Sequence, residues 1–94
     1  MKTRVFVSAD GVRLVADHAG DPAAPSIILL HGGGQTRHSW SRAVTRLASE
    51  GYQVINFDAR GHGESDWSQT GAYRLSDRAA DLAAITATLD QPFL

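Results

Sequence analysis

Hydrophobic and polar residues alternate near the start of the chain. The dipeptide Asp10-Gly11 interrupts the alternation, and the hydrophobic positions around it are Val5, Val7, Val12, Leu14 and Ala16. A period of two is typical of β-strands, and an Asp-Gly pair between two such runs indicates a tight turn, because glycine adopts positive φ at little cost. The pattern predicts an antiparallel hairpin over residues 3–17 with a two-residue turn.

Two later segments have the character of buried strands, and the first of them is a continuous apolar run. Residues 26–30, Ser-Ile-Ile-Leu-Leu, follow a loop over residues 21–25 whose two prolines exclude regular structure, and residues 52–57 end just before Asp58. A continuous run such as 26–30 suits a strand that is buried on both faces of a parallel sheet, and residues 52–57 fit the next buried strand. We therefore predict parallel strands at 26–30 and 52–57.

Helical periodicity follows each of these strands. The first set of apolar positions comprises Trp40, Ala43, Val44, Leu47 and Ala48. The second set comprises Leu75, Ala79, Leu82, Thr86 and Leu89. Each set marks one face of an amphipathic helix. Gly51 is the expected C-terminal cap of the first helix, and Ser76 and Pro92 are the expected N-cap and stop of the second.

The order hairpin, strand, helix, strand, helix predicts an α/β fold. Strands that alternate with helices pair in parallel through right-handed crossovers. Phe93 and Leu94 resemble the start of another buried strand. We therefore expect residues 1–94 to be the N-terminal part of a single, longer domain.

Composition and charge narrow the functional classes. The 94 residues carry a net charge of −1, with 43% hydrophobic residues, as in ordinary globular chains. This balance provides no basic surface, so we expect neither nucleic acid nor membrane as a partner. Without cysteine, disulfides and thiolate metal sites are excluded. The chain begins without an apolar signal-peptide core, so we expect a cytoplasmic protein.

Three glycines follow the first predicted parallel strand, in the segment His31–Gly34. Ligands of α/β proteins bind at the carboxyl ends of parallel strands. No lysine follows, which excludes a phosphate-binding P-loop. A dinucleotide site would use Gly32 and Gly34 with Asp58, although Arg37 stands at its third glycine position. A tight turn without a ligand fits these residues, and so does an oxyanion hole, whose backbone N–H faces the charge developing on a carbonyl oxygen.

A second glycine-rich segment, DARGHGES over residues 58–65, follows the second predicted parallel strand. Asp58 and Arg60 are near enough to pair or to bind loop amides, and His62 lies between two glycines, so we assign all three a loop-ordering role. A general-base role for His62 is disfavoured because no nucleophile is near in sequence. Ser65 fails as a nucleophile because tryptophan replaces the second glycine of G-x-S-x-G.

Metal binding is the remaining chemistry to consider. The imidazole and carboxylate groups that could meet near the strand ends are His31, His38, Asp58 and His62. Their spacing matches no H-x-H or H-E-x-x-H pattern, so we expect neither a metal nor a cofactor.

Together these segments resemble the α/β-hydrolase fold family. The hairpin is similar to the family's first two strands, and the His-Gly pair after residues 26–30 is similar to its oxyanion loop. The pattern D-x-R-G-x-G-x-S over residues 58–65 is similar to the segment after its fourth strand. Trp40 matches a position that is often aromatic in the family.

The resemblance implies roles for several residues. Gly33 would carry the oxyanion N–H, supported by His31, Gly32 and Gly34. The nucleophile, in a G-x-[SDC]-x-G motif, and the rest of the catalytic triad are expected beyond Leu94. The chain therefore contains no catalytic residue, and by itself it should be inactive.

The implied function is that of a hydrolase acting on carboxylic esters or similar small substrates. Epoxide hydrolases, haloalkane dehalogenases and cofactor-free haloperoxidases are relatives, and the nucleophile and lid that distinguish them lie outside the chain. Two other classes stay open: a nucleotide-binding module that uses the Gly32–Gly34 turn and Asp58, and a non-catalytic fragment. Without the family's fifth strand, Ile27–Leu30 would be unpaired on one side and should promote self-association.

Overall fold

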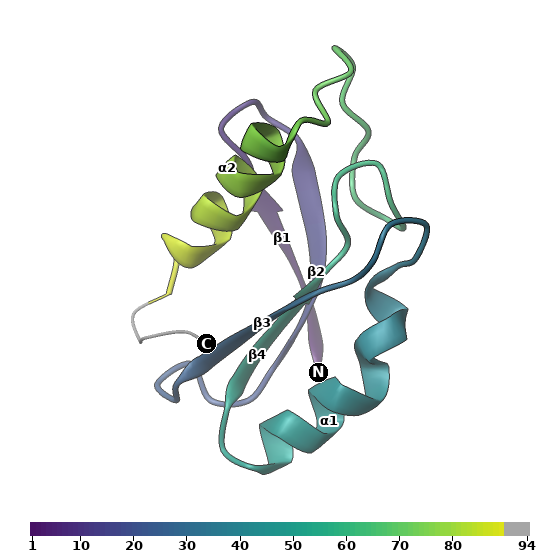
Figure 1. The fold of residues 1–94 in the computed structure, drawn as a ribbon. Coiled ribbons are helices and arrows are strands. Elements are labelled where there is room, and N and C mark those ends of the chain that lie inside the picture. The colour runs from purple at the N-terminus through teal and green to yellow at the C-terminus, as the bar shows by residue number, and fades with distance from the viewer. Residues whose placement is uncertain (90–94) are drawn as a thin grey trace.

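A computed structural model describes residues 1–89 and contains one four-stranded sheet (Figure 1). Its strands are β1 (Lys2–Val7), β2 (Arg13–Ala19), β3 (Ser26–Leu30) and β4 (Gln53–Phe57), in the spatial order β1-β2-β4-β3. β2 runs antiparallel to both β1 and β4, whereas β3 and β4 are parallel. The predicted combination of a hairpin with two parallel strands is confirmed.

The turn of the hairpin differs from the prediction. Ser8 N–H donates to the Val12 carbonyl oxygen at 2.9 Å, and Gly11 N–H donates to the Ser8 carbonyl oxygen at 2.9 Å. Residues 9–11 therefore form a three-residue loop, and Gly11 has a φ of +88°. A turn followed by a glycine in the left-handed region is a common alternative to the two-residue turn, and an Asp-Gly pair suits both.

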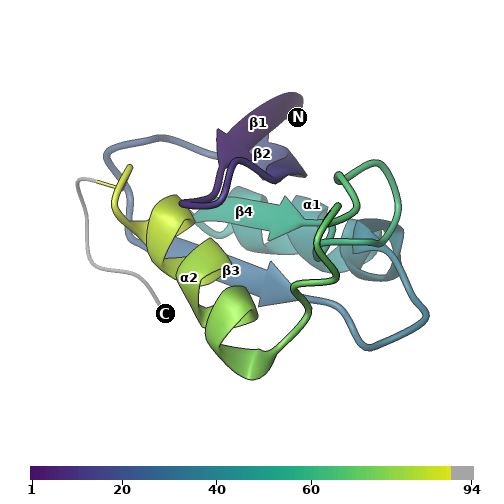
Figure 2. The ribbon, with the colours of Figure 1, turned by 90° about the horizontal axis from the view of Figure 1, so that it is seen from above.

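Two helices cover opposite faces of the sheet (Figures 1 and 2). A 3₁₀ turn, η1 (Arg37–Trp40), leads into α1 (Ser41–Ser49), so α1 begins one residue after the predicted start. Gly51, with a φ of +96°, follows α1 as its predicted cap. Gly51 N–H donates to the Ala48 carbonyl oxygen and Tyr52 N–H to that of Leu47, which is the hydrogen-bond pattern of a Schellman motif.

The second helix, α2 (Leu75–Thr86), is present, but two details of its prediction were wrong. Its N-cap is Arg74 rather than Ser76, and Arg74 N–H donates to the Asp77 carboxylate at 3.0 Å. Its buried residues are Asp81 and Ile85, whereas Leu75 is 84% exposed. Three positions of the predicted face, Leu75, Ala79 and Leu82, line a groove instead of the core, whereas Leu89 packs against the core. The predicted stop at Pro92 and the strand at Phe93-Leu94 lie outside the described residues.

The hydrophobic core lies between the sheet and α2. Its buried members are Phe6, Val12, Leu14, Ala16, Ile55, Phe57 and Ile85. Every residue of β4 is buried, as predicted for a buried strand. Among the described residues β3 pairs with β4 alone, so its three central residues are half-buried and Leu30 is 53% exposed. None of the helices formed by residues 1–89 is both long and apolar enough to cross a membrane.

Candidate functional site

Two glycine-rich loops meet at one end of the sheet. The β3 loop (residues 31–36) follows β3, and the β4 loop (residues 58–66) follows β4. Because β3 and β4 are parallel, their carboxyl ends lie at the same edge of the sheet and bring the two loops together. All the residues proposed from sequence as site residues belong to these loops.

The backbone amides of the three glycines in the β3 loop have different environments. Gly32 N–H donates to Gln35 Oε1 at 3.2 Å, and Gly34 N–H donates to His62 Nε2 at 3.3 Å. Gly33 N–H donates to no group among residues 1–89. A Cβ atom at Gly33 would meet no atom within 4 Å, so this free amide lies at an open surface.

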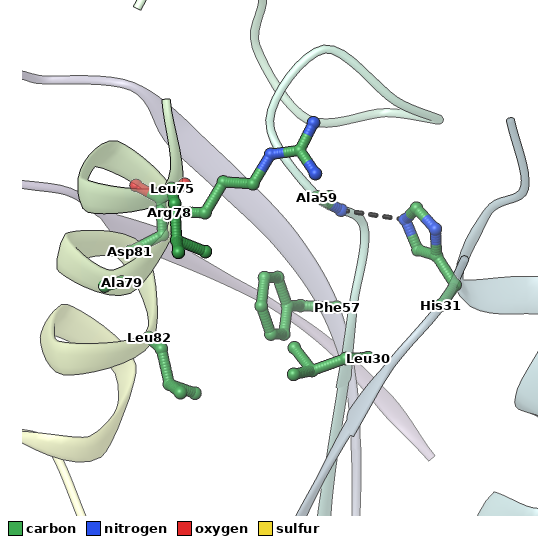
Figure 3. Close-up of a pocket in the computed structure, with 9 residues that line it drawn as sticks. All are labelled: Leu30, His31, Phe57, Ala59, Leu75, Arg78, Ala79, Asp81 and Leu82. Atoms are coloured by element: carbon green, nitrogen blue, oxygen red, sulfur yellow. Dashed lines mark hydrogen bonds between the residues drawn. The ribbon is translucent and has the colours of Figure 1, made fainter. Parts of the chain in front are cut away.

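The imidazoles of His31 and His62 join the two loops. His31 Nε2 accepts a hydrogen bond from Ala59 N–H at 2.9 Å, as drawn in Figure 3. The ring centroids of His31 and His62 lie 5.1 Å apart with a 54° angle between the planes. Each histidine thus contacts both the opposite loop and the other histidine.

Asp58 anchors the β4 loop to the start of η1. Its side chain is fully buried and accepts hydrogen bonds from Arg37 N–H at 2.7 Å, from Glu64 N–H at 3.0 Å and from the Arg37 guanidinium. Burial raises the pKa of the Asp58 carboxyl, but the hydrogen bonds from the two amides and the guanidinium outweigh burial and hold that pKa below its ordinary value. Its carboxylate is therefore occupied within the protein and is not free to bind a ribose.

Arg37 is a buried cation that the sequence reasoning missed. Only 5% of the residue is exposed, and its guanidinium pairs with the carboxylates of Asp17, Asp58 and Glu64. Burial lowers the pKa of Arg37, but its hydrogen bonds to these carboxylates outweigh burial and raise that pKa above its ordinary value. One signal for Arg37 was present in the sequence, namely its place at the third glycine position of a dinucleotide motif. That signal did not indicate which carboxylates Arg37 would contact.

Arg60 joins three separate segments and does not pair with Asp58. It makes a bidentate pair with Asp81 of α2 at 2.6 and 2.7 Å, and it also binds the Asp10 carboxylate and the Ala72 carbonyl oxygen. The hydrogen bonds to Asp81 and Asp10 raise the pKa of Arg60. All five guanidinium N–H groups are thus used, and the side chain is 1% exposed. Asp81, a carboxylate on the buried face of α2, was the missed partner.

Ser65 is also buried, and its hydroxyl is fully engaged. Ser65 Oγ donates to the Asp58 carbonyl oxygen at 2.6 Å and accepts from Val15 N–H at 2.8 Å. A hydroxyl in this position joins β2 to the β4 loop and is not exposed to a substrate. Within residues 1–89, no cluster of three or more His, Cys, Asp or Glu residues is arranged to hold a metal ion.

A groove of about 340 Å³ lies between α2 and the ends of β3 and β4 (Figure 3). Its lining is mostly apolar and comprises Leu30, His31, Phe57, Ala59, Leu75, Arg78, Ala79, Asp81 and Leu82. The exposed residues at the start of α2 therefore face a concave surface next to the β3 loop.

Comparison with known proteins identifies one family. The family described as alpha/beta hydrolase fold matches residues 25–92. The chain is 38% identical over 84 residues to epoxide hydrolase A of Mycobacterium tuberculosis, covering 88% of this chain and 26% of that protein. It is 34% identical over 83 residues to the non-heme chloroperoxidase of Streptomyces lividans, covering 88% of this chain and 30% of that protein.

A solved structure shares the same arrangement. The esterase RhEst1 from Rhodococcus sp. ECU1013 superimposes with a TM-score of 0.81 at 38% identity, covering 93% of this chain and 32% of the esterase. The chain thus spans less than a third of the length of each of these three proteins.

Proposed function

Because this chain belongs to the α/β-hydrolase fold family, we propose that it forms the oxyanion-hole side of a hydrolase active site. The single observation that carries the proposal is the free N–H of Gly33. It is the one glycine amide of the β3 loop without a partner in the described chain. The loop around it is held in place by the hydrogen bonds that the adjacent amides, those of Gly32 and Gly34, donate. An amide fixed in advance stabilises a developing oxyanion without the cost of reorienting it.

The topology supports this location. α1 connects β3 to β4 on one face of the sheet, whereas α2 follows β4 on the other face. Since crossovers are right-handed in nearly all proteins, a strand that follows α2 would lie beyond β3, and the direction of strand addition would reverse there. Ligand sites of open α/β sheets lie at this switch point, which is next to the β3 loop.

The loop-ordering roles of Asp58, Arg60 and His62 belong to the same proposal. Asp58 and Arg60 tie the β4 loop to η1 and α2 through buried ion pairs, and His62 binds the β3 loop directly. His31, Gly32 and Gly34 complete the support of Gly33. No residue of the described part, 1–89, takes the place of a nucleophile, and we propose that the catalytic triad lies outside it.

The proposed substrate is a small molecule with an ester or similar bond. The relatives' names cover an epoxide hydrolase, a chloroperoxidase and an esterase, so this segment is compatible with several reactions. An oxyanion hole serves acyl transfer directly, which favours a carboxylic ester. We also propose a cytoplasmic location and no cofactor.

The test is a chimera of the Rhodococcus esterase in which the region matched by this chain is replaced by residues 1–94. We expect the chimera to hydrolyse an activated ester. Gly33→Pro removes the N–H and should lower kcat by about 10²–10³. Gly33→Ala keeps the N–H and fits the open space, so it should retain kcat. A folded Gly33→Pro chimera with unchanged kcat would place the oxyanion donor elsewhere.

A further inference from the structure

The two histidines of the site hold each other's loops. His31 belongs to the β3 loop and accepts a hydrogen bond from Ala59 N–H in the β4 loop at 2.9 Å. His62 belongs to the β4 loop and accepts one from Gly34 N–H in the β3 loop at 3.3 Å. We call this reciprocal pair of hydrogen bonds the histidine clasp.

The clasp requires one particular protonation state. A backbone N–H can donate only to a ring nitrogen without a proton, so Nε2 is unprotonated in both residues. The other nitrogen, Nδ1, lies 2.8 Å from the Gly32 carbonyl oxygen in His31 and 3.0 Å from the Arg60 carbonyl oxygen in His62. A carbonyl oxygen can only accept, so Nδ1 carries the proton in each ring. These contacts fit the Nδ1–H tautomer of both imidazoles.

The hydrogen bond from His31 Nδ1–H acts directly on the Gly33 amide. The Gly32 carbonyl and the Gly33 N–H belong to the same planar peptide group and point in opposite directions. Fixing the Gly32 oxygen therefore fixes the direction of the Gly33 N–H. His62 fixes the next peptide group through Gly34 N–H. The free amide thus belongs to the first of two consecutive peptide groups that are held by imidazoles.

We propose that His31 and His62 are positioning residues that aim the Gly33 N–H, and that protonation of either ring releases it. This inference rests on the proposed oxyanion role of Gly33. An imidazolium has N–H donors at both nitrogens, so its Nε2 would face another donor and the clasp would open. Acid should therefore release the β3 loop.

None of the charged groups around the clasp would hold a protonated imidazole in its present place. Arg78 and Asp81 of α2 line the groove beside His31. The carboxylates nearby already have cationic partners: Asp81 pairs with Arg60, and Asp58 and Glu64 both pair with Arg37. No carboxylate in the described part of the chain forms an ion pair with either imidazole. An imidazolium at either position would thus gain no counter-ion.

The direct test is NMR of ¹⁵N-histidine-labelled protein, both as the 94-residue chain and in the chimera. We expect Nδ1–H tautomers for His31 and His62 at neutral pH, and amide resonances of Ala59 and Gly34 that shift together with imidazole protonation. His38, whose side chain is exposed, provides the control: His38→Gln should leave both amide resonances in place. An Nε2–H tautomer at either residue, or amides of Gly34 and Ala59 that are undispersed or do not shift on protonation, would overturn the proposal.

Kinetics of the chimera give the functional readout. His62→Leu removes the acceptor and should lower kcat about tenfold or more with little change in KM, because a misaimed catalytic group loses rate rather than binding. His62→Gln supplies an acceptor that does not titrate, so it should recover most of kcat and keep it at acidic pH. A folded His62→Leu chimera with normal kcat would contradict the positioning role. An unchanged kcat in Gly33→Pro would instead disprove the oxyanion assignment, even with the clasp intact.

Discussion

The carboxylate of Asp58 lies against the backbone of Gly63, in the space where any other residue at position 63 would place its Cβ atom. Gly63 also has a φ of +51°, in the left-handed region. The glycine thus allows the β4 loop to turn closely around the buried carboxylate, and the two residues act as one structural unit.

Gly63→Ala should therefore destabilise the chimera. The left-handed backbone costs about 1–2 kcal/mol for a non-glycine residue, and overpacking against Asp58 adds about 1–3 kcal/mol. We expect the free energy of unfolding, measured in urea, to fall by about 2–5 kcal/mol. Gly33→Ala is the matched control, because Gly33 lacks a positive φ and has open space around it, and it should change stability by less than about 1 kcal/mol. Equal losses in both variants would contradict this account.

Removing the buried carboxylate of Asp58 should lower the free energy of unfolding more than removing an exposed carboxylate. Asp58→Ala leaves the guanidinium of Arg37 buried with one partner fewer, and breaking a buried pair costs about 3–5 kcal/mol. The control is Glu50→Ala, since Glu50 forms an exposed pair with Arg46 in which both side chains are about half-exposed or more. Exposed pairs contribute at most about 1 kcal/mol. Urea unfolding of both variants in the chimera makes the comparison, and similar losses would contradict it.

The pKa of Asp58 also predicts how stability depends on pH. A carboxyl whose pKa is lower in the folded state stabilises the protein above its unfolded pKa of about 3.9, and this contribution is lost as pH falls through the folded value. Asn at position 58 does not titrate. Between about pH 5 and pH 2, the unfolding free energy of Asp58→Asn should therefore fall less than that of the parent chimera. Parallel pH curves would show that Asp58 is not a main source of acid sensitivity.

Elements with strong local patterns could be predicted from the sequence, whereas the partners of buried charges could not. Gly51 was identified as a helix cap because a cap depends on the backbone of adjacent residues. Arg37 and its three carboxylates come from three separate segments, namely η1, β2 and the β4 loop, so no local pattern connects them. The partners of Arg60 could not be predicted for the same reason, because Asp10 and Asp81 are distant from it in sequence.

The face of α2 was predicted wrongly for a related reason. Leucine and alanine at its first turns suggested a buried stripe, but Leu75 and Ala79 line the groove beside the β3 loop. Hydrophobic periodicity indicates which residues avoid water and does not distinguish a core from an open apolar groove. The buried Asp81, which lines the same groove, is explained only by Arg60, which reaches it from the β4 loop.

Ser65→Ala should lower the stability of the chimera without changing its catalytic activity. In the chimera we expect unchanged turnover of an activated ester, because the hydroxyl is buried and bonded to Asp58 and Val15. Stability should fall by about 1–3 kcal/mol, since the Val15 amide loses its acceptor. Ser39→Ala, at an exposed position, is the control.

The 94-residue chain by itself should show no saturable hydrolysis, and activity that disappeared on Ser65→Ala would make Ser65 a nucleophile.

The two edge strands of the described sheet differ in charge. β1 carries Lys2 and Arg4, and charged side chains on an edge strand discourage pairing with another chain. β3 has the sequence Ser-Ile-Ile-Leu-Leu and no charge. Among residues 1–89 it pairs only with β4, so the N–H and C=O groups along its other side have no strand partner there. An apolar, uncharged edge of this kind is a template for strand addition.

We therefore predict that the 94-residue chain self-associates through β3 and not through β1. At micromolar concentration, sedimentation should detect dimers or larger species. Leu30→Lys places a charge on β3 at a side chain that is already 53% exposed, and it should shift the protein toward monomer. Val5→Lys, at a residue of β1 that is 54% exposed, adds the same charge to the other edge and should leave the association unchanged. A monomeric parent chain, or equal effects of the two lysines, would show that β3 is not the associating edge.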